Sequence, residues 1–199
     1  MNILTRAQEV IDHEAAVLRA INLDDNFVKA VDILFSCKGK VITTGMGKAG
    51  IIAHKMASTL CSTGTPASFL HPGEAAHGDL GLLASGDVIV AFSTSGKTRE
   101  VIEMLKLADH FGIDHIIGIT SHVDSEIRSL SSVVINMGEI SEPCRLGLTP
   151  TASTIAMLAL GDALSLVLMD SKEFSRKEYG LRHHAGYLGL KARQEFSDD

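Results

Sequence analysis

The sequence predicts an α/β protein, a three-layer sandwich in which a five-stranded parallel sheet of flavodoxin-like order 2-1-3-4-5 is flanked by helices. From residue 40 onward, short apolar segments alternate with segments of helical periodicity, a pattern typical of βαβ units. The apolar segments show little polar alternation, as strands buried on both faces do. Two strand-to-helix turns are rich in glycine or hydroxyl side chains, and such turns mark the ligand-binding edge of open α/β sheets.

Two helices are expected before the sheet, within residues 2–37. From Asn2 to Asn22, isoleucine, leucine, valine and alanine recur at helical spacing. The second helix is expected from Asp25 to Cys37, with the pair Asp24-Asp25 at its start, where short acidic side chains cap free backbone N–H groups.

The sheet core is expected within residues 40–136. The five predicted strands are residues 40–45, 66–70, 87–93, 114–120 and 132–136. Helical patterns lie between them, notably Lys48–Cys61 and Thr98–Phe111.

A C-terminal helix and tail make up residues 149–199. The helix is expected from about Thr151 to Ser171, with Thr149 as a cap and Pro150 at the first helical position. It is apolar nearly all round, which predicts burial on all sides and indicates a subunit interface. Its most apolar stretch is too short to span a bilayer comfortably. No repeat or linker divides the chain, so residues 1–199 are expected to form a single domain.

Composition narrows the possible functions. The chain has 199 residues, is 45% hydrophobic and only 5% aromatic, and carries a net charge of −6. An acidic chain with few aromatic residues lacks the basic face that a nucleic-acid backbone requires. The three cysteines, Cys37, Cys61 and Cys144, are widely spaced, which favours a reducing compartment. The N-terminus has no apolar run of signal-peptide length, so we expect a cytoplasmic protein.

The first turn that could bind a ligand runs from Thr43 to Gly50, directly after a predicted strand. Its glycines let the backbone approach a ligand, and the helix that follows offers free N–H groups to an anion. Gly45, Gly47 and Gly50 also match the G-x-G-x-x-G spacing of a dinucleotide site. A dinucleotide site also has an Asp or Glu about twenty residues after its glycines, but the first acidic residue after this turn is Glu74. The alternative to a ligand-binding turn is a tight turn that binds no ligand.

The second turn, from Ser93 to Glu100, carries the stronger signal. Four hydroxyl side chains lie within six residues at a helix start, namely Ser93, Thr94, Ser95 and Thr98. Hydroxyl and N–H donors with a helix dipole form a cup for phosphate. The alternative is a helix cap with surplus serines. In a 2-1-3-4-5 sheet both turns flank one crevice, so together they predict a site for a phosphorylated small molecule, with Thr44 nearby.

Three further segments supply titratable groups: residues 71–81, 139–147 and 182–186. Histidine titrates near neutral pH and suits proton transfer. The pairs His71 with His77 and His183 with His184 could be metal ligands, but neither spacing matches a zinc signature. We therefore expect no metal and no cofactor.

Four stretches resemble the arabinose-5-phosphate isomerases, a family of sugar isomerase (SIS) domains. They are G-M-G-K from Gly45, F-L-H-P-G-E-A-A-H-G-D-L-G from Phe69, S-x-S-G from Ser93, and L-G-L-x-P-T-x-S-T from Leu146. The resemblance extends over about residues 5–195. The segment from Phe69 is specific to that family, whereas the short hydroxyl loop is common to all SIS domains.

This resemblance implies a fold, an assembly and a reaction. It implies a tetramer with active sites shared between subunits, and interconversion of D-ribulose 5-phosphate and D-arabinose 5-phosphate for 3-deoxy-D-manno-octulosonate synthesis, which feeds lipopolysaccharide or capsule. The family's catalytic positions fall on Lys48, His77, Glu100, Glu142 and His183.

The chain departs from the family pattern at three places. Many relatives carry a C-terminal pair of CBS modules, whereas this sequence ends at Asp199, so regulation through such modules is not expected. Relatives have serine where Ala49 stands. Relatives also read S-H-P-G-G where this chain has residues 182–186, although His183 is retained.

Isomerisation through an enediol needs a base at the C1–C2 edge and a group that stabilises the enediolate. We assign Glu142 as the base, with a raised pKa in a partly closed pocket, His77 to proton movement between the oxygens, and Lys48 to the enediolate. Glu100 and His183 would orient or assist. As alternatives, Glu100 only complements a helix start and His77 is a buried structural histidine.

Two other functions remain open at this point. One is a non-catalytic sugar-phosphate sensor, and the other is an isomerase of a different phosphosugar. The sequence has no helix-turn-helix extension or basic stripe, which favours an enzyme.

Overall fold

The computed structural model describes residues 1–194 and contains a five-stranded, fully parallel sheet of order β2-β1-β3-β4-β5. The predicted fold class and strand order are confirmed. Central strand β3 pairs Val88 with Val41 of β1 and with His115 of β4. The strands are β1 (Val41–Gly45), β2 (Ala67–Phe69), β3 (Val88–Phe92), β4 (His115–Thr120) and β5 (Val133–Asn136).

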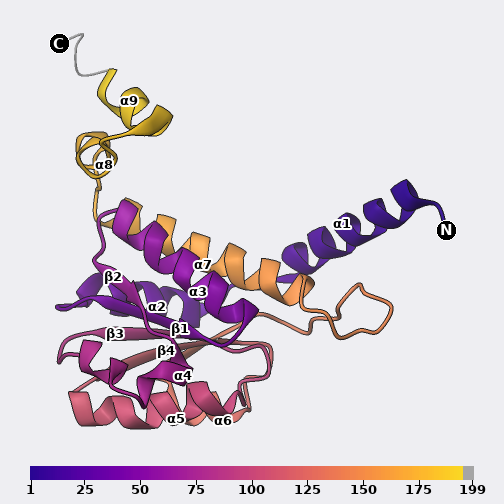
Figure 1. Cartoon of the computed structure of the whole chain (residues 1–199), viewed down its shortest axis with the longest axis horizontal. Coiled ribbons are helices and arrows are strands. Elements are labelled where there is room, and N and C mark those ends of the chain that lie inside the picture. Colours follow the sequence, from indigo (N-terminus) through magenta and orange to yellow (C-terminus); the bar gives the residue numbers. More distant parts are fainter. Residues whose placement is uncertain (195–199) are drawn as a thin grey trace.

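Helices cover both faces of the sheet (Figure 1). One layer contains α2 (Asp25–Ser36), α3 (Lys48–Ser62) and α7 (Ala152–Ser171), and the other contains α4 (Pro72–Ala75), α5 (Arg99–Ala108) and α6 (Glu126–Leu130). Alternate strand residues feed the two cores, because successive side chains of a strand point to opposite faces. Thus Val88 and Val90 belong to the core shared with α2, α3 and α7, whereas Ile89 and Ala91 belong to the core shared with α4, α5 and α6.

Helix α7 is a core helix. Among the described residues it alone has the length and apolar composition of a membrane-spanning helix. Its side chains Met157, Leu160, Leu164 and Leu168 are nevertheless buried in the core that it shares with α2 and α3. Burying these four side chains inside the protein removes their apolar surface from water. Leu166 and Val167, in contrast, are 48% and 41% exposed.

The two ends of the chain extend from opposite ends of α7 (Figure 1). Helix α1 (Ile3–Ala20) lies near the start of α7 and contains no buried residue. Beyond the end of α7 come α8 (Arg176–Arg182) and α9 (Gly186–Gln194). The last five residues of the predicted 149–199 tail lie outside the described residues.

Some expected boundaries need correction. Helix α7 begins at Ala152 with Thr151 as its N-cap, so Pro150 precedes the helix and is not its first residue. The predicted helix Thr98–Phe111 divides into α5 and the 3₁₀ turn η2 (Asp109–Phe111). The segment after β2, for which no helix was predicted, folds into α4 and the 3₁₀ turn η1 (Asp79–Leu82).

Candidate active site

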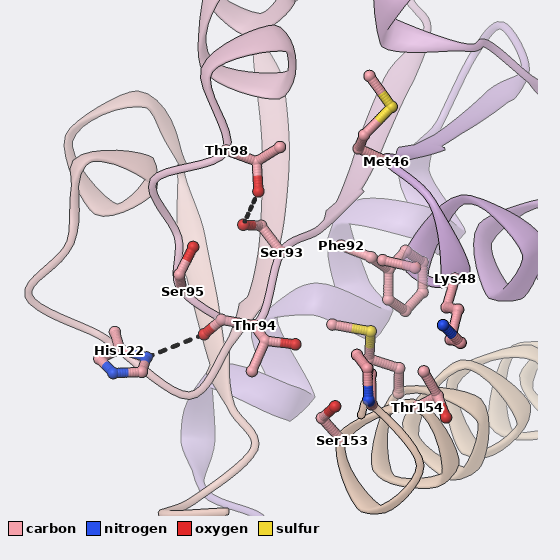
Figure 2. A pocket seen from close by; sticks show the side chains of 13 residues that line it. Met46, Lys48, Phe92, Ser93, Thr94, Ser95, Thr98, His122, Ser153 and Thr154 are labelled. Atoms are coloured by element: carbon pink, nitrogen blue, oxygen red, sulfur yellow. Dashed lines mark hydrogen bonds between the residues drawn. The ribbon is translucent and has the colours of Figure 1, made fainter. Parts of the chain in front are cut away.

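A cavity of about 320 Å³ lies at the carboxyl edge of the sheet, between the loop after β3 and the start of α7 (Figure 2). The carboxyl ends of β1 and β3 open onto it, as the strand order requires. Its wall is made of four parts, which are the turn after β1 (Met46, Lys48, Ala49), the end of β3 with its loop (Phe92, Ser93, Thr94, Ser95, Thr98), His122, and the first turns of α7 with the preceding proline (Pro150, Ser153, Thr154, Met157).

The turn after β1 brings α3 directly against the strand end. A Cβ atom on Gly50 would lie 2.5 Å from the carbonyl oxygen of Gly45, so only glycine permits this approach. Gly47, the N-cap of α3, has a φ of 60°. The predicted ligand-binding glycines Gly45 and Gly47 therefore shape the turn, and neither of them lines the cavity.

Thr44 has a different place from the one that the sequence indicated. Its side chain is fully buried, and its hydroxyl donates to the carbonyl of Leu70 at 2.8 Å. A hydroxyl that already donates inside the core cannot also donate to a ligand in the cavity. We therefore leave Thr44 out of the proposed phosphate site.

The hydroxyl loop after β3 is held in one shape by its neighbour β4. The carbonyl of Thr94 accepts hydrogen bonds from the backbone N–H of Ser121 and from the hydroxyl of Thr120, at 3.1 and 3.0 Å. Gly96 has a φ of 62°, and a Cβ there would collide with the Ser125 hydroxyl at 1.8 Å. Contacts within the protein thus set the shape of this loop.

The hydroxyl groups of this loop surround a helix start. Ser93 Oγ and Thr98 Oγ1 lie 2.9 Å apart, and Thr98 is the N-cap of α5. Ser95 Oγ accepts a 3.3 Å hydrogen bond from the N–H of Lys97. In Figure 2 these side chains lie along one wall of the cavity. Hydroxyls and first-turn N–H groups gathered at a helix N-terminus are suited to a phosphate dianion.

Lys48 lies across the cavity from the hydroxyl loop (Figure 2). It is the first residue of α3 and is exposed. An ammonium group here adds positive charge to a cavity that already has N–H and O–H donors on its far wall. The cavity is therefore suited to an anion.

Glu142 caps the start of α7. Its carboxylate accepts hydrogen bonds from the N–H groups of Thr151, Ala152 and Ser153 at 2.8, 2.8 and 3.1 Å, and from the Ser153 hydroxyl at 2.5 Å. Ser153 lines the cavity, whereas Glu142 itself does not, so the carboxylate reaches the cavity wall only through its hydrogen bond with Ser153. These bonds also explain why α7 begins after Pro150.

The expected pKa of Glu142 was wrong in direction. Burial raises the pKa of this carboxyl, but hydrogen bonds from the Ser153 hydroxyl and from three backbone N–H groups outweigh burial and hold the pKa below its usual range. Hydrogen bonds to the charged form favour ionisation. Glu142 is therefore a carboxylate at neutral pH, and the same hydrogen bonds make it a weaker base than an ordinary glutamate.

His77 and Glu100 line a second, smaller cavity of about 190 Å³ between α4 and α5. His77 is exposed, so the alternative of a buried structural histidine is wrong. Glu100 lies in the first turn of α5, two residues after Thr98 of the larger cavity. The two cavities therefore flank the same helix start.

His183 lies far from both cavities within one chain. It is the C-cap of α8, its Nδ1 lies 3.0 Å from the carbonyl of Tyr179, and its ring stacks on that of Tyr179 with centroids 3.9 Å apart. The 20 residues of α7 separate it from Glu142, a length of about 30 Å at 1.5 Å per residue. The five predicted catalytic residues thus occupy three separate places in the subunit.

Sequence reasoning missed His122. It lines the cavity two residues after β4, and its Nδ1 lies 2.9 Å from the Thr94 carbonyl. That carbonyl can only accept, so Nδ1 carries the proton. The position of this histidine directly after a strand end was the available signal. Within residues 1–194, no three His, Cys, Asp or Glu side chains are grouped so as to hold a metal ion.

The chain is similar in sequence to a known domain family and to curated enzymes. The SIS domain family matches residues 33–167. An arabinose 5-phosphate isomerase KdsD from Francisella tularensis is 46% identical over 173 residues, covering 85% of this chain and 53% of the relative. The KdsD of Escherichia coli K12 is 39% identical over 193 residues, covering 96% and 58%. The chain thus spans little more than half the length of these curated relatives.

Two solved structures share the fold over their whole length. An Escherichia coli CFT073 protein in complex with arabinose 5-phosphate has 35% identity and a TM-score of 0.88, covering 92% of this chain and 100% of that one. A Bacteroides fragilis protein, described as a candidate phosphosugar isomerase involved in capsule formation, has 44% identity and a TM-score of 0.90, covering 94% and 100%.

Proposed function

Because this chain belongs to the SIS domain family, we propose that it is an aldose–ketose isomerase that interconverts D-ribulose 5-phosphate and D-arabinose 5-phosphate. The observation that carries the proposal is the cavity in which the hydroxyl loop faces Lys48, with the Glu142 carboxylate bound to Ser153 of its wall. Curated relatives at 36–46% identity carry this activity in their names. We propose that residues 1–199 act as a single domain.

The proposed chemistry moves two protons and changes no net oxidation state. A carboxylate takes the proton from C2 of the aldose, and the electrons form the C1–C2 double bond of an enediolate. Proton movement between O1 and O2 and return of a proton to C1 complete the ketose. The reaction therefore requires no redox cofactor, and an ammonium beside the enediolate oxygens stabilises the charge that develops there.

We propose a role for each of these residues. Ser93, Thr94, Ser95 and Thr98 would bind the phosphate through hydroxyl and N–H groups, with Gly45 and Gly47 shaping the opposite turn. Glu142 would be the base at carbon and Lys48 the enediolate partner. His77 would serve proton transfer between oxygens, and Glu100 would orient or assist. Both residues line the smaller cavity, so like His183 they would act on a substrate in the larger cavity only if the assembly brings them to it.

His183 requires a second subunit to reach a cavity, which fits an active site shared between chains. Helix α1 exposes Ile3 and Leu4 at 76% and 81%, and α7 exposes Leu166. Exposed apolar side chains on two helices favour association of copies. We predict a homotetramer, and sedimentation at micromolar concentration is expected to give four times the 21.2 kDa chain mass. A monomer alone would contradict the shared site.

The activity is tested directly with D-ribulose 5-phosphate, without added metal or nucleotide. We expect D-arabinose 5-phosphate as the product, which would supply 3-deoxy-D-manno-octulosonate synthesis for lipopolysaccharide or capsule in the cytoplasm. Turnover only with another phosphosugar would assign a different isomerase. Binding of the phosphosugar without turnover of any would assign a sensor.

The phosphate loop provides a separate prediction. Ser95→Ala is expected to weaken substrate binding by about 1–3 kcal/mol, the cost of losing a hydrogen bond to a charged group. Steady-state kinetics would record this as a higher KM. Ser129→Ala is the matched control, because Ser129 is exposed and its hydroxyl donates only to the carbonyl of Glu126 within α6. Wild-type KM and kcat in Ser95→Ala would place the phosphate elsewhere.

A further inference from the structure

Helix α1 holds the backbone on both sides of Glu142. The guanidinium of Arg6 donates to the carbonyl of Pro143. His13 Nε2 lies 2.7 Å from the carbonyl of Ser141, and since a carbonyl only accepts, this ring nitrogen donates. The residues directly before and after Glu142 are therefore both bound by side chains of the same helix.

The spacing within α1 explains how one helix makes both contacts. Arg6 and His13 are seven residues apart, which is close to two helical turns, so they lie on one face of the helix. That face lies toward the loop. Both side chains are only partly exposed, whereas Gln8 and Asp12, which bond to each other at 2.8 Å, are exposed.

Glu142 is thus fixed from two directions. Its carboxylate is held by the first turn of α7, and its neighbouring carbonyls are held by α1. Pro143 also restricts Glu142 to an extended backbone.

We propose that Arg6 and His13 are positioning residues that set the location of the Glu142 carboxylate beside Ser153 of the cavity wall. This rests on the role proposed above for Glu142. The physical reason for an effect on rate is that proton transfer from carbon requires the base in place, and a displacement of about 1 Å can cost on the order of a hundredfold. Neither residue touches the cavity itself.

The test is a double variant, Arg6→Met with His13→Phe, which keeps side-chain bulk and removes both donors. We expect kcat to fall by about 10- to 100-fold with KM within about threefold of wild type. Combined with Glu142→Gln, the double variant should lower kcat by less than about threefold more, because residues acting through one group are not additive. An equal loss in both backgrounds, or no loss in either, would overturn the proposal.

Three controls separate positioning from general damage to α1. Gln8→Ala with Asp12→Ala removes a bonded pair from another face of the helix, and Glu9→Gln removes the 3.0 Å ion pair of Arg6 while keeping its guanidinium. Both should leave kcat near wild type. His13→Gln retains a donor and should recover most of the lost rate.

A measurement without substrate keeps this proposal distinct from the proposed activity. Hydrogen exchange at the N–H groups of Thr151 and Ala152, which donate to the Glu142 carboxylate, should accelerate about tenfold or more in the Arg6→Met, His13→Phe variant. It should stay unchanged in the Gln8→Ala, Asp12→Ala control. Unchanged exchange in the test variant would refute the positioning role even if the protein proved to be a sensor.

Discussion

Glu142→Gln is expected to lower kcat by a factor on the order of 10²–10⁴, the usual contribution of a general base. Glutamine retains the size of glutamate but cannot take a proton from the substrate carbon. Exchange of solvent deuterium into that carbon should fall by a comparable factor. Exchange at the wild-type rate would exclude Glu142 as the base, and His77 would be the next candidate.

The same substitution should also destabilise the fold, because Glu142 caps α7. Loss of a charged cap costs about 0.5–2 kcal/mol of unfolding free energy at neutral pH. A carboxyl with a lowered pKa stabilises the folded state above its usual value of 4.5, and this contribution disappears as the pH falls below 4.5 through the folded pKa. The stability gap between wild type and variant should therefore close in acid.

The control is Glu139→Gln, which makes the same change three residues earlier on an exposed side chain. It should leave both kcat and unfolding free energy near wild type. Denaturation measured beside kinetics then separates the two roles of Glu142. A loss of stability with unchanged kcat would reduce Glu142 to a helix cap.

Lys48→Met is expected to lower kcat by about 10²–10³, the usual cost of removing one group that stabilises an oxyanion. Methionine keeps much of the side-chain length but removes the ammonium that faces the hydroxyl loop across the cavity. KM should change much less than kcat, because the enediolate charge develops only in the transition state. Initial-rate kinetics in both directions would measure the division between kcat and KM.

Lys55→Met is the matched control on the same helix. Lys55 pairs with Asp162 outside the cavity, and an exposed ion pair contributes at most about 1 kcal/mol to stability. Its kcat should remain near wild type. A Lys48→Met variant with a raised KM and normal kcat would move Lys48 from the enediolate to the phosphate.

Much of the fold could be predicted because its signals are local. Strands buried on both faces must be apolar at successive positions, so β3 and β4 are visible as short unbroken runs. Hydroxyls clustered at a helix start also require no distant information, and the loop from Ser93 to Thr98 lines the cavity as expected. The short helix α4 was missed because its four residues show no helical period.

The sequence by itself determined the parallel sheet and the chemical character of the loop after β3, because period, strand burial and hydroxyl clustering are properties of neighbouring residues. The strand order was predicted from the flavodoxin-like arrangement, and the structure confirms it. Only the tertiary structure decided the ionisation of Glu142. Its hydrogen-bond donors come from residues nine to eleven positions later, and the carbonyls on either side of it bind α1, more than 120 residues earlier. It also placed Thr44 in the core and His183 at the far end of α7. A pKa, a cavity wall or a shared site depends on groups that the fold brings together. The spacing of these groups along the chain does not specify how far apart they lie in space.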